Sequence, residues 1–129
     1  RQFDNYLMMA QGHPCEQCGL MGRCTPQFVV ESDGSVYPCD FYALDKYHLG
    51  NIMENTVDEI AKSPAMARFA MDQNEHRSQR CLSCPARGMC GGGCRRYRPL
   101  YFSDGDYCPM EDFFTKQYKK IVQLASLVR

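Results

Sequence analysis

Seven of the nine cysteines in this chain fall into two patterns whose short spacings suit metal coordination. In the first, nine residues separate Cys24 from Gly34, and four more separate Gly34 from Cys39. The second is C-x2-C-x5-C-x3-C followed by a single cysteine, and its members are Cys81, Cys84, Cys90, Cys94 and Cys108. Spacings this short bring thiolates together through local chain geometry, which favours tetrahedral thiolate sites over a ladder of disulfides. We therefore expect the chain to hold metal.

Glycines surround the second cysteine pattern, at Gly88 and at 91–93. Because glycine has no Cβ, its backbone can pass close to a metal cluster and point N–H groups at sulfur. A single zinc ion needs no such cradle, whereas N–H···S hydrogen bonds tune the potential of an iron–sulfur cluster. The residues therefore favour iron–sulfur, and structural zinc, above all in protein made in air, is the alternative.

Bulk composition narrows the class of protein. A chain of 129 residues makes one domain, and a formal net charge of zero gives no broad attraction to nucleic acid or membrane. It has no apolar run long enough to span a membrane and no secretory signal segment. The odd number of cysteines argues against an oxidising compartment, so we expect a cytoplasmic location. The chain begins at Arg1, and we expect it to be part of a longer polypeptide.

Short elements must position these cysteines. Asp33-Gly34 between the β-prone runs 28–31 and 35–38 predicts a two-residue hairpin turn, and the second strand then delivers Cys39. The stretch 41–50 is predicted to be a connector. A short helical segment is expected before residue 15.

Helix signals follow the hairpin. Asn55 or Thr56 can cap a helix that runs to about Lys62, and Ser63 followed by Pro64 predicts the start of another. In the last twenty residues the apolar positions repeat with helical spacing from residue 110 onward. The predicted fold is therefore α+β and loop-rich, with a β-hairpin, short helices, two four-cysteine sites and a C-terminal helix.

The cysteine pattern resembles the SPASM domain, the auxiliary-cluster domain at the C-terminus of many radical S-adenosylmethionine enzymes. The signature of that family is C-x9–15-G-x4-C, then C-x2-C-x5-C-x3-C, then a last cysteine, and this sequence fits it without departure. The segment 27–42 and the run from Gly91 to Arg96 look like those of the anaerobic sulfatase-maturating enzymes.

This resemblance implies two auxiliary 4Fe-4S clusters. Spacing alone would instead group neighbours, with Cys15 in the first set, Cys94 in the second and Cys108 spare. In the subfamily the ligands interlace, which leaves Cys15 spare, as a plain buried thiol or as a replacement for Cys18. The implied ligands are Cys18, Cys24, Cys39 and Cys94 for the first cluster, and Cys81, Cys84, Cys90 and Cys108 for the second.

The resemblance also implies a reaction. The parent enzymes oxidise a cysteine or serine of a sulfatase to formylglycine, and the acid beside the second hairpin cysteine, here Asp40, serves as the base. The domain would support electron transfer, binding of the substrate peptide and abstraction of the proton. Without the resemblance, a turn cap or ion-pair partner is the ordinary role of such an aspartate. Arg95, Arg96 and Arg98 could dock a peptide or stabilise an anionic cluster, although a solvated face is commoner for such a run.

One departure limits what this chain does alone. The radical site needs C-x3-C-x2-C, and Tyr97 stands where the third cysteine would follow Cys94. We therefore expect S-adenosylmethionine to bind only in the full-length parent, and this chain by itself to be inactive. Its expected partners are a sulfatase polypeptide and the N-terminal radical domain of the same chain, or the substrate of another peptide-modifying SPASM enzyme, with no nucleic acid and no membrane.

The resemblance implies a division of the chain into three parts. Residues 1–14 are expected to be a remnant of the preceding catalytic domain or linker. Residues 15–109 would form the twin-cluster domain, and residues 110–129 a C-terminal packing helix.

Overall fold

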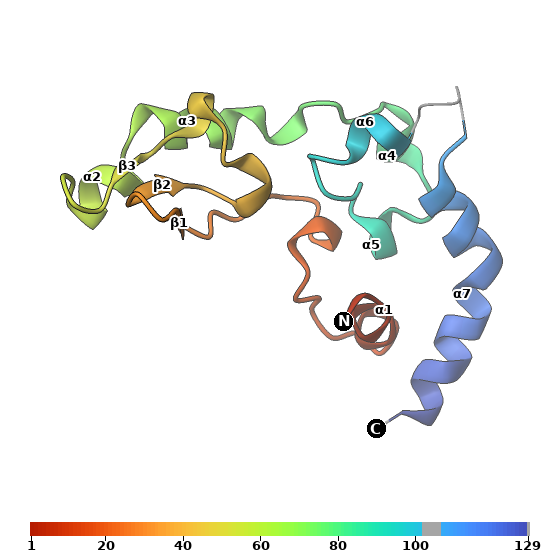
Figure 1. Ribbon diagram of the computed structural model, residues 1–129. Helices are drawn as coiled ribbons and strands as arrows, with labels where there is room; N and C mark the ends of the chain where they lie inside the picture. Colours follow the sequence, from red (N-terminus) through yellow and green to blue (C-terminus); the bar gives the residue numbers. More distant parts are fainter. Residues whose placement is uncertain (102–106, 129) are drawn as a thin grey trace. The chain divides into compact units, whose positions relative to one another are not determined.

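In a computed structural model, residues 1–101 and 107–128 are described. Residues 102–106 of the cysteine-rich stretch and Arg129 of the expected last helix lie outside them. The chain forms two compact units, which are called unit 1 and unit 2 below (Figure 1). Unit 1 combines Arg1–Arg23 with His76–Arg129, and unit 2 is the continuous segment Cys24–Glu75.

Unit 1 is built from helices and loops. Its elements are α1 (Gln2–Ala10), a 3₁₀ turn (Cys18–Leu20), α4 (Arg80–Ser83), α5 (Arg87–Cys90), α6 (Arg98–Tyr101) and α7 (Pro109–Leu127). Helix α1 packs against α7, and the Gln11 side chain donates hydrogen bonds to the carbonyl oxygens of Ala125 and Val128, both at 2.7 Å (Figure 1). The segment before residue 15 and the C-terminal segment are therefore helical, as expected.

Buried apolar side chains join the elements of unit 1 into one core. Tyr6 from α1 stacks edge-on against Phe114 from α7, with ring centroids 4.9 Å apart. Residues of α5 complete the core: Met89 and Cys90 are buried in the same cluster. Of the apolar positions that repeat with helical spacing in α7, Phe114, Ile121 and Ala125 are buried. Tyr118 and Leu124 of the same repeat are exposed, so the buried stripe is narrower than the spacing predicts.

Unit 2 contains the sheet. Its elements are β1 (Val29–Val30), β2 (Ser35–Tyr37), β3 (Gly50–Asn51), α2 (Val57–Ala61), α3 (Pro64–Met71) and three 3₁₀ turns (Asp40–Tyr42, Asp45–Tyr47 and Asp72–Asn74). The three strands form an antiparallel sheet in the order β1-β2-β3. The pairs Val30↔Val36 and Val36↔Gly50 set the register, and the Val36 side chain is buried in a cluster with Leu49 and Ile60. The α+β, loop-rich class is confirmed.

The hairpin differs in detail from its prediction. Glu31 N–H donates to Ser35 O at 2.9 Å, so residues 32–34 form a three-residue loop in place of the expected two-residue turn. Gly34 occupies the left-handed region at φ +84°, which matches the common three-residue hairpin that ends in a glycine bulge. The strand β3 lies in the stretch predicted to be a connector, because two residues are too short to carry a periodic signal.

The two helices of unit 2 begin where local chemistry indicates. Thr56 caps α2 in a reciprocal capping box with Glu59, and Ser63 caps α3, whose first residue is Pro64. Among the described residues, no helix combines the length and apolar character needed to cross a membrane.

Candidate metal centres

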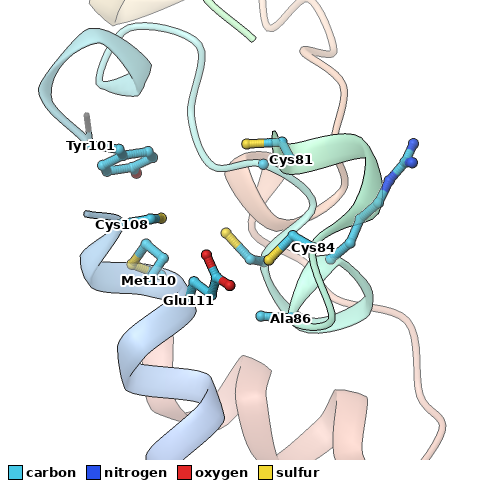
Figure 2. A pocket seen from close by; sticks show the side chains of 10 residues that line it. Cys81, Cys84, Ala86, Tyr101, Cys108, Met110 and Glu111 are labelled. Atoms are coloured by element: carbon cyan, nitrogen blue, oxygen red, sulfur yellow. The ribbon is translucent and has the colours of Figure 1, made fainter. Parts of the chain in front are cut away.

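Four cysteines of unit 1 surround one cavity. Cys81 and Cys84 come from α4 and the residue after it, and Cys108 comes from the start of α7 on the opposite side (Figure 2). Cys90, the last residue of α5, completes the set. The other lining residues are Ala86, Arg87, Gly92, Tyr101, Met110 and Glu111. Four sulfur donors from three segments therefore face one space.

Local structure explains how the donors converge. A single helical turn places Cys81 and Cys84 three residues apart on one side, because positions i and i+3 are neighbours in a helix. Arg80 precedes Cys81, and its Nε forms an ion pair with Glu111 Oε2 at 2.8 Å. Glu111 lies three residues after Cys108. This pair connects α4 to α7, the elements beside Cys81 and Cys108.

The environment of Cys90 and Cys81 opposes the ionisation of these two thiols without a cation. Burial raises the pKa of Cys90, and the neighbouring Cys108, Cys81 and Cys84 raise it further, against a hydrogen bond that the Gly92 N–H donates. Burial likewise raises the pKa of Cys81, and so do Cys108 and Cys84. Thiolates this close repel one another, and a bound metal would supply the missing positive charge.

Tyr101 forms part of the cavity wall. Burial, with the nearby sulfurs of Cys90 and Cys94, raises the pKa of Tyr101 to about 12, so the ring stays a neutral phenol. Its ring lies directly on Gly93, where a Cβ would overlap it. The glycine is thus required for packing of this ring, a role that the spacing of the cysteines does not reveal.

The donor set fits a cluster better than a single ion. Across residues 1–101 and 107–128, no three His, Cys, Asp or Glu side chains converge on a point where one metal ion would bind. The four cysteines instead surround a space, and a 4Fe-4S cluster takes four thiolates at the separate corners of a cube. The residues present therefore fit an iron–sulfur cluster held by Cys81, Cys84, Cys90 and Cys108.

Unit 1 also brings the 3₁₀ turn Cys18–Leu20 against Cys94. Gly19, beside Cys18, approaches so closely that a Cβ on it would lie 3.2 Å from Cys94 N. Gly91, at φ +60°, lies against the carbonyl of Leu20, where a side chain would overlap backbone. The glycine triplet therefore packs two loops together. The sequence suggested only that its backbone approaches a cluster.

Unit 2 gathers Cys24 and Cys39 against an aromatic cluster. The rings of Tyr42, Tyr47 and Phe69 meet edge to face, with centroids 5.4 to 5.6 Å apart, and both cysteines pack on them. Each unit thus contains two of the four cysteines that the resemblance assigns to the first cluster.

Gln73 holds the backbone of Cys24. Its Oε1 accepts the Cys24 N–H at 2.7 Å, and its Nε2 donates to Cys24 O at 3.3 Å, so one amide satisfies both polar groups of the residue. Sequence reasoning missed this residue. Forty-nine positions separate the partners, and no local spacing signals such a pairing.

Asp40 is exposed beside Cys39. The Cys39 thiol donates to Asp40 Oδ1 at 3.2 Å, and the Phe41 N–H donates to the same oxygen at 3.0 Å. The carboxylate thus lies next to a predicted cluster ligand.

The structure bears on two further expectations, and it changes the second of them. Cys15 does not line the four-cysteine cavity and packs on the core of unit 1, consistent with a spare thiol. Of the three clustered arginines, only Arg96 is exposed, while Arg95 and Arg98 are buried. A solvated face is therefore wrong for Arg95 and Arg98, because tertiary packing encloses both.

Comparison with known proteins agrees with this geometry. The model of the SPASM family, described as an iron–sulfur cluster-binding domain, matches residues 15–85. Cysteine-type anaerobic sulfatase-maturating enzymes from Clostridium novyi and Clostridium perfringens are 37% and 40% identical, each over 97% of this chain and 34% and 33% of their own length. A serine-type enzyme from Bacteroides thetaiotaomicron is 28% identical over 94% of this chain and 29% of its own length.

Solved structures resemble the chain over its whole length. Native anSMEcpe with bound AdoMet superposes with a TM-score of 0.81 at 35% identity, covering 99% of this chain and 36% of that one. The same protein with bound AdoMet and Cp18Cys peptide also gives 0.81 at 35% identity, covering 100% and 37%. The chain spans about a third of the length of these relatives.

Proposed function

Because the chain belongs to the SPASM family of iron–sulfur cluster-binding domains, we propose that it carries two auxiliary 4Fe-4S clusters. The proposed ligands of the first are Cys18, Cys24, Cys39 and Cys94, and those of the second are Cys81, Cys84, Cys90 and Cys108. The observation that carries the proposal is the cavity of unit 1, whose lining includes Cys108 and omits Cys94 among the described residues. This supports the interlaced ligand set over grouping by nearest neighbours.

The proposal extends to the whole protein. We propose that it is a cytoplasmic anaerobic sulfatase-maturating enzyme that oxidises a sulfatase residue to formylglycine, with S-adenosylmethionine bound by its N-terminal radical domain. Similar structures contain AdoMet and a peptide, which supports the cofactor and a polypeptide substrate. The higher identity and coverage of the cysteine-type relatives favour cysteine as the residue oxidised.

In this reaction Asp40 would receive the proton. Oxidation of the substrate side chain removes one hydrogen atom, one proton and one electron, and a carboxylate close to the substrate can take the proton. The Phe41 N–H would continue to orient Asp40 Oδ1, whereas the Cys39 hydrogen bond requires a protonated thiol and ends when Cys39 serves as a ligand. When bound, the clusters would supply a site that accepts the electron.

Metal and sulfide analysis tests this function. The protein is reconstituted with iron and sulfide and purified without oxygen, and iron, labile sulfide and zinc are measured per chain. Residues 1–129 should account for about eight iron and eight sulfide, as expected for two 4Fe-4S clusters. About two zinc without sulfide, resisting reconstitution, would make this a structural zinc module and remove the role in electron transfer.

A further inference from the structure

Arg77 places a positive charge behind the four-cysteine cavity of unit 1. Its Nη2 donates to Gly22 O at 2.5 Å, which anchors the guanidinium on the loop after Cys18. Its Nε is buried and has no hydrogen-bond partner, and among the described residues Arg77 forms no ion pair. The cation therefore has a buried donor that the polypeptide, as described, leaves unsatisfied.

Gly92 connects this donor to the cavity. Arg77 Nε lies 3.9 Å from the position that a Cβ on Gly92 would occupy, and Gly92 lines the cavity. The Gly92 N–H donates to the Cys90 sulfur, and its carbonyl accepts a hydrogen bond of 3.2 Å from Arg98 Nε. Burial and the nearby Cys108 raise the pKa of Cys81, and the charges of Arg77 and Arg98 oppose that rise.

The surroundings of Arg77 offer little negative charge. In the sequence of unit 1, 12 Lys and Arg residues stand against 6 Asp and Glu, a formal charge of +6. Among the described residues that line the cavity, the acidic one is Glu111, and it pairs with Arg80. A buried donor without a partner destabilises the fold, so such a site gains stability from an added anion.

A 4Fe-4S cluster with four thiolate ligands is an anion, and its reduction adds one more negative charge. Net charge and hydrogen bonds near the cluster set its reduction potential. A positive charge at the wall of its cavity stabilises the reduced form more than the oxidised form, and thus raises the potential.

We propose that Arg77 is a positioning and charge-compensating residue for the second cluster, which raises the reduction potential of that cluster through the Gly92 wall. This inference rests on the proposed function, because it requires the cluster held by Cys81, Cys84, Cys90 and Cys108. It adds a residue outside the cysteine signature.

The test is a redox titration of the intact protein, reconstituted without oxygen and reduced stepwise with dithionite. The signal of the second cluster in electron paramagnetic resonance is identified as the one that Cys84→Ala removes. At the wild-type midpoint, Arg77→Gln should lower the ratio of reduced to oxidised cluster about tenfold, which is 59 mV for one electron. Arg77→Lys, which keeps the charge, should lie closer to wild type.

Lys120→Gln is the matched control, because it removes the same charge from an exposed position on α7. If Arg77→Gln and Lys120→Gln give the same midpoint, the proposal is overturned. Should Arg77→Gln lose its iron, Arg77→Lys decides: a cluster retained near the wild-type potential supports charge compensation, and loss in both variants makes Arg77 a packing residue. Failure of the proposed function itself is distinct, since wild type would then contain no second 4Fe-4S cluster.

Discussion

Unit 1 and unit 2 carry opposite charge although the chain as a whole is neutral. Unit 2 has 3 Lys and Arg residues against 9 Asp and Glu, a formal charge of −6, whereas unit 1 has +6. The zero net charge of the chain therefore excludes fewer charged partners than it suggested, because it averages two units of opposite charge. Basic surroundings suit anionic clusters, and unit 1 contains all four proposed ligands of the second.

The units also differ in what holds them together. Unit 2 has a three-stranded sheet, two capped helices and an aromatic cluster around Phe69, so ordinary packing defines its structure. In unit 1, short helices of four residues surround the cavity, and helices this short have little stability of their own. We infer that the fold of unit 1 depends more on bound metal than that of unit 2.

The largest expected effect comes from single ligand substitutions. Cys108→Ala should remove the second cluster, and Cys24→Ala the first, each with a loss of about four iron. Cys15→Ala should lose none. Iron and sulfide analysis with paramagnetic resonance checks this, and removal of the same signal by Cys108→Ala and Cys24→Ala would contradict the interlaced assignment.

Asp40→Asn tests the chemistry assigned to unit 2. A positioned general base contributes about 10²- to 10⁴-fold, so kcat of the intact enzyme should fall within that range while its iron content stays constant. Asp45→Asn, a matched change in the same unit, should leave kcat unchanged. Equal turnover of Asp40→Asn and wild type would eliminate the base assignment.

Phe69→Ala tests the claim that packing holds unit 2. The ring is fully buried between Tyr42 and Tyr47, and removal of a buried phenylalanine costs about 3–5 kcal/mol. Urea unfolding of the metal-free protein should show this loss, and Val57→Ala, at a position 77% exposed, should show almost none. A small effect at Phe69 would mean that unit 2 also depends on metal.

Gln73→Ala should loosen the first cluster and spare the second. It leaves the N–H and carbonyl of Cys24 without their partner, at a cost of about 1–3 kcal/mol. Loss of iron to a chelator should accelerate for the first cluster only, whereas Gln73→Glu, which keeps the acceptor, should be intermediate. Equal acceleration at both clusters would show a general loss of folding instead.

The smallest effect concerns the start of α2. Hydrogen bonds from the Thr56 N–H and hydroxyl lower the pKa of Glu59 below its ordinary 4.5. The carboxylate is preferred in the folded state, so its contribution is present above the ordinary pKa and is lost as the pH falls through the folded value. Comparison of wild type with Glu59→Gln in urea at about pH 6 and about pH 4 should show a difference that shrinks with acid. A difference that does not change with pH would contradict a role for the carboxylate charge.

Local signals predicted the hairpin strands and the helices α1, α2, α3 and α7. The caps at Thr56 and Ser63 were predictable because they depend on contacts within three residues. Strand β3 was missed, because its two residues are ordered only by pairing with β2. The four-residue helices α4, α5 and α6 were missed as well, because elements this short carry no periodic signal.

The amino-acid sequence was therefore enough to establish the number of thiols, their short spacings and the hairpin that delivers Cys39. Which distant groups meet depends instead on tertiary packing. Cys108 joins Cys81, Cys84 and Cys90 around one cavity, Gln73 clamps Cys24, and Arg77 lies behind Gly92. The physical reason is range, since spacing along the chain records interactions within a turn, whereas contacts between distant segments depend on how whole elements pack.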